Sequence, residues 1–207
     1  MFRNIIFDWS GVIKDAVVHL DWVVNRMFQD FGGGQMTIRE IRENWEQPYM
    51  KFWNKYFPEL KLEEEQKIYY KAISDKDCPK AGAYPGIVDF IKRLKSKGVS
   101  MVILSSDPPE TLFPEMEQFG LENIFDEAVV KIHDKSEEIE GLIMRNNFKK
   151  EETVFIGDSN HEIEVGKQAG IKTVAVTWGF GTEEKLKAKG PDYLVHNIKE
   201  LEDALLN

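Results

Sequence analysis

The fold is decided by a short stretch near the start of the chain, Ile5-Ile6-Phe7-Asp8-Trp9-Ser10-Gly11-Val12-Ile13. Its apolar run ends abruptly at Asp8, and a glycine follows three residues later. A short apolar run of this kind is typical of a strand buried on both faces of a parallel sheet. Asp8 would then lie at the carboxyl end of that strand, where open α/β sheets bind their ligands. A carboxylate there can bind a hard cation, attack as a nucleophile, or simply close a turn.

The composition is that of one large domain, or of a domain with a smaller one inserted. The chain has 207 residues, and 42% of them are hydrophobic, which is enough for a sizeable core. A formal net charge of -9 argues against general nucleic-acid binding, because that function needs a basic face. No apolar run approaches the roughly 20 residues of a membrane span, and no signal peptide is expected. Cys78 is the only cysteine, so we expect no internal disulfide and a cytoplasmic location.

From residue 85 onwards, predicted strands alternate with predicted helices. The strands are expected at 99–104, 128–132, 153–156, 173–176 and 193–195, and the helices at 87–98, 108–119, 136–148, 160–169, 182–188 and 197–206. Asp107 is a candidate cap for the helix that begins at Pro108. The alternation predicts an α/β fold: a doubly wound parallel sheet, Rossmann-like, with right-handed crossovers.

Between the first strand and residue 80 the pattern is helical only. Helices are expected over 17–28, over 37–57 with a break at Pro48, and over 62–73. We therefore predict an all-helical domain at residues 15–80, inserted into an α/β core domain made of residues 1–14 and 81–207. The run of Glu63, Glu64 and Glu65 is interpreted as a solvated helix start. An aromatic stripe forms either the core of this insert or a wall that closes over a substrate, and it comprises Trp45, Tyr49, Phe52, Trp53 and Tyr56.

Polar side chains follow the predicted strands. Asp8 follows the first strand, Ser105 the second, and Asp158 the fourth, while Lys135 comes shortly after the third and Glu162 opens the helix after Asp158. Because the carboxyl ends of parallel strands meet at one edge of a sheet, we expect these side chains to converge. Carboxylate oxygens suit Mg²⁺, and a hydroxyl and an ammonium can hold phosphate oxygens.

Simpler interpretations exist for three of these residues. Ser105 could merely begin a turn, and Lys135 could be a solvated lysine in a loop. Glu162 stands three residues after Ser159, which is the spacing of a capping box. The residue pattern alone leaves these alternatives open.

Taken together, four segments resemble the motifs of the haloacid dehalogenase-like hydrolase superfamily. They are Phe7-Asp8-Trp9-Ser10-Gly11-Val12, Ile103-Leu104-Ser105-Ser106, Lys135, and Gly157-Asp158-Ser159-Asn160-His161-Glu162. The resemblance covers about residues 1–13 and 80–207, and the helical insert matches the family's cap in position and length. The segment Trp178-Gly179-Phe180-Gly181 is similar to the end of phosphoglycolate-phosphatase-like members.

The resemblance implies a magnesium-dependent phosphatase that acts on a small phosphorylated metabolite. It implies that Asp8 is the nucleophile and forms an aspartyl-phosphate, and that Ser105 and Lys135 complete the catalytic group. Ser10, Ser105, Ser106 and Lys135 are the residues implied to bind substrate. Neither nucleic acid nor membrane is an expected partner, and the protein is expected to be a monomer or a weak homodimer.

The resemblance also implies a Mg²⁺ site. Its expected ligands are the carboxylates of Asp8 and Asp158, the backbone carbonyl of Ser10, and Glu162 in the inner or outer shell.

One position departs from the family pattern. Phosphatases of the family usually carry a second aspartate two residues after the nucleophile, which protonates the leaving oxygen and then activates water; here that residue is Ser10. A serine hydroxyl does not titrate near neutrality, so it cannot replace the carboxyl directly. Either the substrate has a good leaving group, or Asp15, His19 or Asp107 delivers the proton, or turnover is slow. The alternative functions are therefore a phosphonate or other non-ester hydrolase, and a catalytically weakened member that binds a phosphorylated ligand or a protein partner.

Overall fold

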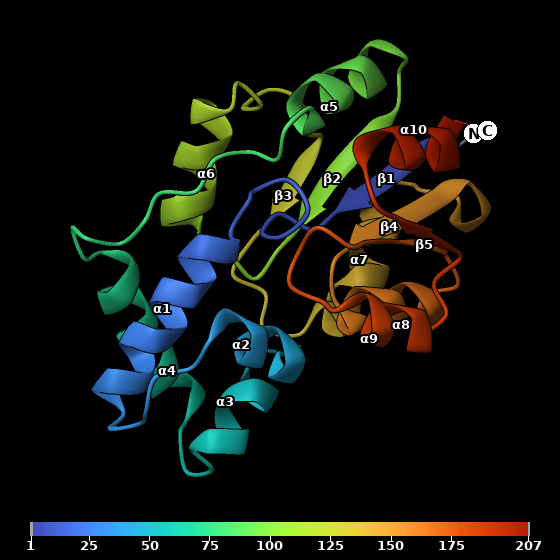
Figure 1. The fold of residues 1–207 in the computed structure, drawn as a ribbon. Coiled ribbons are helices and arrows are strands. Elements are labelled where there is room, and N and C mark those ends of the chain that lie inside the picture. The colour runs from blue at the N-terminus through green and yellow to red at the C-terminus, as the bar shows by residue number, and fades with distance from the viewer. Residues whose placement is uncertain (1, 207) are drawn as a thin grey trace.

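A parallel sheet with helices on both faces forms the centre of the molecule (Figure 1), and the computed structural model describes residues 2–206. The sheet has six strands in the order β3-β2-β1-β4-β5-β6, and every neighbouring pair is parallel. The strands are β1 (Asn4–Phe7), β2 (Ser100–Leu104), β3 (Glu127–Val129), β4 (Thr153–Gly157), β5 (Lys172–Val176) and β6 (Tyr193–Val195). The predicted α/β, doubly wound fold is confirmed.

Within residues 2–206, ten α-helices and two short 3₁₀ helices accompany the strands. The helices are α1 (Val17–Asp30), α2 (Ile38–Asn44), α3 (Met50–Tyr56), α4 (Leu62–Ile73), α5 (Ile87–Ser96), α6 (Pro109–Gln118), α7 (Ile139–Arg145), α8 (Asn160–Gln168), α9 (Glu183–Ala188) and α10 (Ile198–Leu206). The 3₁₀ helices are η1 (Lys135–Glu137) and η2 (Lys150–Glu152).

The two faces of β1 are buried against different helices. Ile5 and Phe7 belong to a hydrophobic cluster with α5, α6 and α10, whereas Ile6 belongs to a second cluster with α7 and α8. Successive side chains of a strand point to opposite faces, so a strand covered on both sides must be apolar throughout. This burial explains why the opening stretch is continuously hydrophobic up to Asp8.

The strand order reverses at β1: β2 and β3 follow on one side of it, and β4, β5 and β6 on the other. The carboxyl ends of β1, β2 and β4 therefore lie side by side. Phe7 pairs with Ile103 of β2 on one side and with Ile156 of β4 on the other. The chain leaves β1, β2 and β4 at nearly the same level, and the crevice outside such a switch point is where open α/β sheets bind ligands. Asp8 lies at that point.

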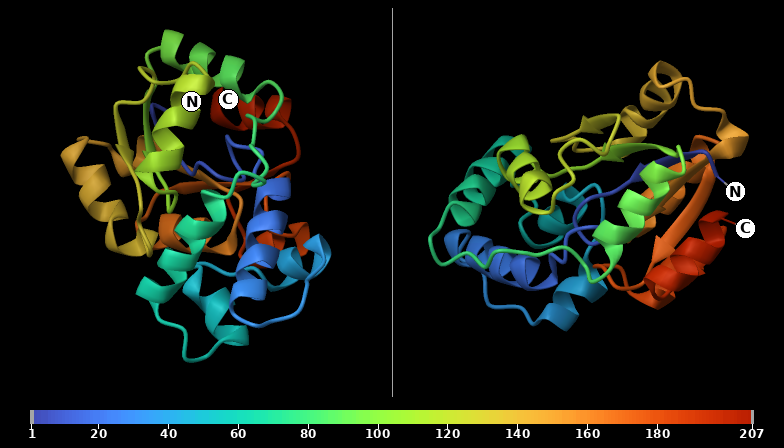
Figure 2. Two further views of the ribbon diagram at one scale, coloured as in Figure 1. Left: turned by 90° about the vertical axis from the view of Figure 1, so that its left-hand side faces the viewer. Right: turned by 90° about the horizontal axis from the view of Figure 1, so that it is seen from above.

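The helices α1 to α4 form the inserted helical cap that the sequence predicted. They gather beyond one end of the sheet, on the opposite side of the molecule from α10 (Figure 2), and they pack around a hydrophobic cluster of their own. That cluster also takes in Phe180, which lies in the loop after β5. The cap and the core therefore share an apolar contact near the crevice.

Two predicted elements are shorter than expected. The strand predicted at 128–132 is only Glu127–Val129, because Lys131 adopts a left-handed backbone with φ of 58°, which a strand cannot accommodate. The helix predicted at 136–148 is divided into η1 and α7, with Glu138 between them at φ -110°. The tight first turn keeps Lys135 inside the molecule rather than on a helix surface.

The predicted capping role of Asp107 is wrong. The helix begins at Pro109 with Pro108 as its N-cap residue, and no side chain caps it. A proline at the first helical position is already favourable, because its missing N–H would have no partner there. The Asp107 carboxylate is engaged elsewhere, as described below.

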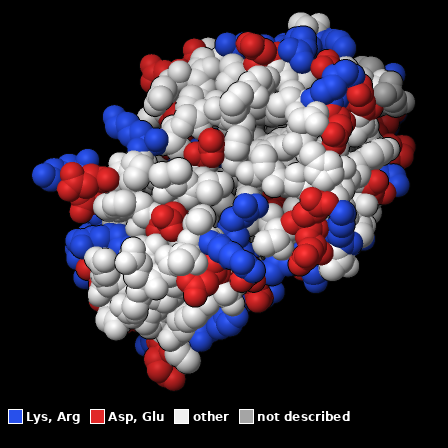
Figure 3. Space-filling view, viewed as in Figure 1, with Lys and Arg blue, Asp and Glu red and all other residues white. Residues whose placement is uncertain are grey.

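Acidic and basic side chains are interspersed over the face of the molecule shown in Figure 3. Among residues 2–206, no helix combines the length and the apolar character that crossing a bilayer requires.

Candidate active site

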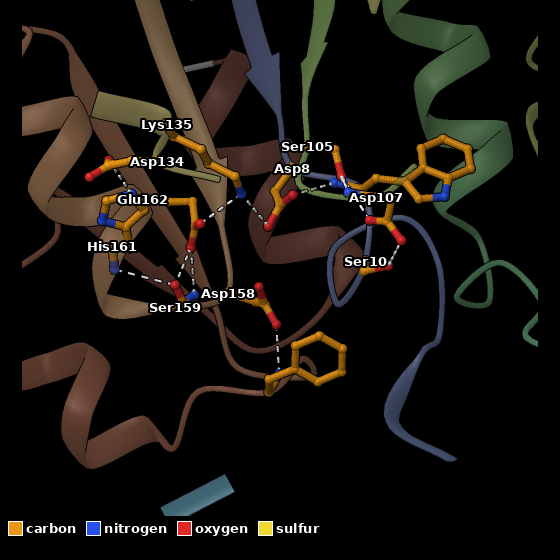
Figure 4. Close-up of polar contacts among 12 residues, drawn as sticks. Asp8, Ser10, Ser105, Asp107, Asp134, Lys135, Asp158, Ser159, His161 and Glu162 are labelled. Atoms are coloured by element: carbon orange, nitrogen blue, oxygen red, sulfur yellow. Dashed lines mark hydrogen bonds and ion pairs between the residues drawn. The ribbon is translucent and has the colours of Figure 1, made fainter. Parts of the chain in front are cut away.

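Three buried carboxyl groups meet at the carboxyl edge of the sheet. Asp8 follows β1, Asp158 follows β4, and Glu162 lies in the first turn of α8, and ligand oxygens of the three lie within 4.8 Å of one another. The side chains converge as drawn in Figure 4. The convergence that the strand ends predicted is therefore present, and the three groups are close enough to share one cation.

Lys135 lies between two of these carboxylates. Its Nζ is 2.8 Å from Oδ2 of Asp8 and 2.7 Å from Oε1 of Glu162, and the residue is only 2% exposed. The interpretation of Lys135 as a solvated loop lysine is wrong. The lysine is held as the positive centre of a buried ion-pair network (Figure 4).

Glu162 serves two structural purposes at once. Its Oε2 accepts hydrogen bonds from the backbone N–H of Ser159 at 3.0 Å and from the Ser159 hydroxyl at 2.5 Å. These contacts complete the capping box at the start of α8. The capping interpretation is confirmed through Oε2, while Oε1 faces Lys135 and its role in metal binding stays a prediction.

Asp158 lies in a tight backbone cradle. Its Oδ2 accepts a hydrogen bond of 2.6 Å from the backbone N–H of Phe180. A Cβ added at Gly11 would lie 2.0 Å from the same oxygen, and one added at Gly179 would lie 2.1 Å from it. Gly11 also has a φ of +87°, a conformation that glycine adopts at no steric cost. Any larger residue at either glycine would displace the carboxylate.

The nucleophile candidate is held at both oxygens. Oδ1 of Asp8 accepts a 2.7 Å hydrogen bond from the Trp9 backbone N–H, while Oδ2 faces Lys135. Burial raises the pKa of Asp8 to about 7; Lys135 opposes this rise, and Glu162 and Asp107 add to it. The groups around the Asp8 carboxylate therefore carry too little positive charge to balance its negative charge.

The same imbalance affects the rest of the cluster. Burial, together with the charges of Asp8 and Glu162, raises the pKa of Asp158 well above its usual value. Burial also acts to raise the pKa of Glu162, but Lys135 outweighs it and holds that pKa at about 2. Burial acts to lower the pKa of Lys135, and the two carboxylates beside it raise it instead. Three acids share one ammonium, so the site fits a divalent cation that prefers oxygen ligands, such as Mg²⁺.

Ser10 and Ser105 are joined through one carboxylate. Oδ1 of Asp107 accepts a hydrogen bond of 2.9 Å from the Ser10 hydroxyl, and Oδ2 accepts one of 2.7 Å from the Ser105 hydroxyl. Of the three residues considered as proton donors, Asp107 is the one with a hydrogen bond to Ser10. Asp15 is exposed, and the ring of His19 bonds the carbonyl oxygen of Pro79 at 3.0 Å.

A buried charge pair behind Asp107 was not predicted. Lys14 is 1% exposed; its Nζ lies 2.7 Å from Oε1 of Glu115 and 3.9 Å from Oδ1 of Asp107. The indole N–H of Trp9 donates to the other oxygen of Glu115 at 2.8 Å. This network fixes the strand-end loop against α6, and nothing local in the sequence marks its members as partners.

A cavity of about 850 Å³, including its solvent-filled mouth, lies between this site and the cap. Ser10, Ser106 and Asp107 line it from the core, and the Ser106 hydroxyl is buried without a partner among the described residues. The predicted aromatic stripe divides here: Phe52 is buried in the cap core, whereas other members also line the cavity, namely Trp45, Tyr49 and Trp53.

Glu65 is buried, although the sequence indicates a solvated helix start at Glu63, Glu64 and Glu65. Glu63 and Glu64 are exposed as expected, but Glu65 is 3% exposed and lines the cavity. A carboxyl one turn into α4 points to the apolar side of the cap, because helix geometry places adjacent residues about 100° apart. The prediction of a solvated Glu65 is wrong.

The burial of Glu65 predicts a pH-dependent loss of stability. Burial raises its pKa from 4.5 to about 8, and a hydrogen bond from Trp53 opposes this rise. Between those values the folded protein binds more protons than the unfolded chain, so stability falls as pH rises. Denaturant unfolding should show Glu65→Gln more stable than the parent at pH 8 by a few kcal/mol, since one pKa unit corresponds to about 1.4 kcal/mol. The difference should vanish near pH 4.5, whereas the exposed Glu63→Gln should match the parent throughout; a parallel pH slope in all three proteins would contradict the argument.

Comparison with known proteins gives a consistent set of relatives. The family model described as haloacid dehalogenase-like hydrolase matches residues 5–176. The chain is 26% identical to a phosphoglycolate phosphatase of Synechococcus elongatus, covering 98% of this chain and 97% of the relative. It is 25% identical to the pyrophosphatase PpaX of Halalkalibacterium halodurans, covering 97% and 95%. Among solved structures, a predicted phosphatase from Clostridium acetobutylicum superposes with a TM-score of 0.87 at 23% identity, covering 100% and 99%, and so shares the fold.

Proposed function

Because the chain belongs to the haloacid dehalogenase-like hydrolases, we propose that it is a magnesium-dependent phosphatase acting on a small phosphorylated metabolite through an aspartyl-phosphate. The observation that carries the proposal is the approach of Asp8, Asp158 and Glu162 to within 4.8 Å, beside the buried Lys135. The names of the relatives in Synechococcus elongatus and Halalkalibacterium halodurans, a phosphoglycolate phosphatase and a pyrophosphatase, support the same reaction class.

The carboxylates of Asp8 and Asp158 and the backbone carbonyl of Ser10 would hold Mg²⁺. Bound there, the ion would neutralise charge on the phosphoryl oxygens and favour the ionised form of Asp8. Glu162 adds its negative charge nearby, while its two oxygens hold Lys135 and Ser159.

The chemistry proceeds in two balanced steps. In the first, an oxygen of Asp8 attacks phosphorus, a bond from Asp8 to phosphorus forms, and the ester oxygen leaves as an alcohol after taking a proton. In the second, water attacks phosphorus and returns a proton to the group that protonated the alcohol, the bond to Asp8 breaks, and inorganic phosphate is released. Lys135 offsets the negative charge on the transferring group, and the hydroxyl of Ser106 supplies a hydrogen bond to it. The Ser105 hydroxyl supplies another once it releases the Asp107 carboxylate.

Asp107 is assigned the proton transfer that Ser10 cannot perform by itself. Its carboxylate contacts the hydroxyl at the position where the family usually has an aspartate, and it also lines the cavity. The carboxyl group assigned to proton transfer therefore belongs to the loop after β2 in this chain, and not to the residue two positions after Asp8. Ser10 keeps it in place by donating a hydrogen bond.

The assignment of Asp107 predicts a dependence on the leaving group. Asp107→Asn should lower kcat/KM for an alkyl phosphate by about 10² to 10⁴, the usual range for general acid catalysis. The same variant should lose less than about tenfold with p-nitrophenyl phosphate, whose phenolate leaves without a proton. Steady-state kinetics with both substrates measure the difference, and equal losses would show instead that Asp107 acts only by positioning Ser105.

The helical insert is assigned as a cap that closes over the substrate. We place its boundaries at residues 15–80, with residues 1–14 and 81–207 forming the core domain. Closure of such a cap excludes water and sets specificity. The substrate's phosphoryl group would lie at the carboxyl edge of the sheet and its organic part in the cavity.

Metal dependence tests the proposal as a whole. The purified protein should hydrolyse p-nitrophenyl phosphate with added Mg²⁺, and excess chelator should remove the activity reversibly. Release of phosphate from a phosphonate but from no ester would favour the non-ester hydrolase, and binding without turnover of any compound would favour the weakened member. A cytoplasmic location and a monomeric or weakly dimeric state remain predictions.

A further inference from the structure

The cavity above the site has an unusual balance of charge. The charged residues among those that line it are Glu65, Asp107 and Lys131. Glu65 and Asp107 are buried, whereas Lys131 is exposed and its ammonium lies 5.6 Å from the ring centroid of Tyr70. Two buried carboxyl groups therefore line the cavity. The buried Lys14 lies 3.9 Å from Asp107, whereas Lys131 is on the solvent side.

Aromatic rings surround the same space. The six that line the cavity are Trp45, Tyr49, Trp53, Tyr69, Tyr70 and Phe180. The faces of such rings carry negative potential and attract cations, most strongly where water is excluded. Rings combined with a buried carboxylate form the type of site that recognises an ammonium group.

Glu65 has no positive partner of its own. Among residues 2–206, the groups that shift its pKa are its buried surroundings and the Trp53 side chain, and neither is a cation. A buried carboxyl without a counter-ion is costly to ionise. A ligand that brings an ammonium would supply the missing charge in a medium where the attraction is strong.

His19, which also lines the cavity, has a ring nitrogen that is not hydrogen-bonded to any described residue. Its Nδ1 bonds the carbonyl oxygen of Pro79 at 3.0 Å, which requires the proton on that nitrogen and leaves a lone pair on Nε2. Nε2 is buried without a partner among the described residues. Burial, with the charge of Lys14, lowers the pKa of His19. A donor-bearing ligand suits this nitrogen, and a carboxylate or phosphate does not.

We propose that the substrate is a phosphate monoester whose alcohol part carries a cationic amino group, which the cavity binds between Glu65 and the aromatic rings. This inference rests on the proposed phosphatase function and specifies its substrate class. Phosphoglycolate and pyrophosphate, which appear in the names of the relatives, each place a second anion where this protein has buried acids. The specificity of this chain therefore differs from the one those names indicate.

Three matched series of compounds test the proposal. They are ω-aminoalkyl, n-alkyl and ω-carboxyalkyl phosphates with chains of two to six carbons, so that length is varied without assuming the reach of the cavity. At the best length, kcat/KM for the amine should exceed that for the alkyl compound by about tenfold or more, and the carboxylate should be the poorest substrate.

Substitution of Glu65 identifies the residue responsible. Glu65→Gln keeps the shape of the side chain, so the ratio of kcat/KM for the amines to kcat/KM for the alkyl compounds should fall at least tenfold. Glu63→Gln, an exposed change in the same helix, should leave both unchanged. An amine preference that survives Glu65→Gln, or no preference at all, overturns the proposal.

Binding separates this inference from the proposed function. Calorimetry with the non-hydrolysable ω-aminoalkyl and alkyl phosphonates, in the presence of Mg²⁺, measures the preference without any turnover. Hydrolysis of alkyl phosphates with no amine preference would reject the inference and keep the phosphatase. An amine preference in binding that Glu65→Gln removes, with no hydrolysis of any ester, would keep the inference about the ligand and reject the phosphatase.

Discussion

Asp8→Asn should abolish phosphatase turnover, lowering kcat by roughly 10⁴-fold or more, as expected when a nucleophile is removed. An amide is not nucleophilic towards phosphorus, yet asparagine has the size of aspartate and keeps an oxygen that can accept the Trp9 N–H bond. The loss should therefore occur without loss of the fold. Steady-state assays with p-nitrophenyl phosphate and Mg²⁺ measure it, and circular dichroism verifies the fold.

The matched control for this substitution is Asp89→Asn. Asp89 is exposed in the first turn of α5, so the change removes one carboxylate without touching the site. Its activity should equal that of the parent. If Asp8→Asn retains activity within about tenfold, some other group attacks phosphorus, and the assignment of Asp8 is wrong.

Lys135→Met should have the largest effect on stability. Breaking a buried ion pair by removing one partner costs about 3–5 kcal/mol, because the remaining charge has no compensation. Here two carboxylates, Asp8 and Glu162, lose their common partner at once. Denaturant unfolding should show a lower free energy of unfolding, and activity should be lost as well. Added Mg²⁺ should restore part of the stability, since it neutralises the same carboxylates.

An exposed lysine provides the comparison. Lys150 pairs with Glu140 at 2.8 Å, but the two side chains are 46% and 57% exposed. Lys150→Met should cost less than about 1 kcal/mol, the usual value of a surface ion pair. Similar losses for the two variants would mean that the pairing of Lys135 in the crevice contributes no more than a solvated contact.

The residues at the strand ends could be predicted because topology determines where they lie. Once the order of strands and helices indicates a parallel sheet, Asp8, Ser105 and Asp158 must approach the same edge. Lys135 and Glu162 come only a few residues after strand ends, so they approach the same edge of the sheet. The convergence of these side chains could therefore be predicted from the pattern, whereas the capping of α8 by Glu162 was one of two alternatives that the pattern left open.

The residues that shape specificity could not be predicted in the same way. Glu65 reaches the cavity only because α4 packs in one particular rotation against the rest of the cap, and its neighbours Glu63 and Glu64 are exposed. Asp107 was interpreted as a helix cap, a local role, whereas its partners Ser10 and Ser105 are assembled by the fold. Contacts of this type depend on tertiary packing, which periodicity does not encode.

The buried ion pair of Lys14, which affects stability, could not be predicted for the same reason. A lysine beside an apolar stretch is normally solvated, and here it is buried against Glu115, a residue of α6 far along the chain. Element boundaries were affected as well: a left-handed residue, Lys131, ended β3 early. Backbone exceptions of this kind arise from the surroundings rather than from residue preference.

The central claim is that a phosphoryl group is transferred to Asp8 before it reaches water. Rapid acid quench of the enzyme during turnover, followed by digestion and mass spectrometry, tests this directly. The peptide that contains Asp8 should carry the mass of one phosphoryl group, and this mass should be absent without Mg²⁺ and absent in Asp8→Asn. A phosphoryl group on a different residue, or rapid turnover with no phosphorylated peptide and phosphate release unaffected by Asp8→Asn, would contradict it.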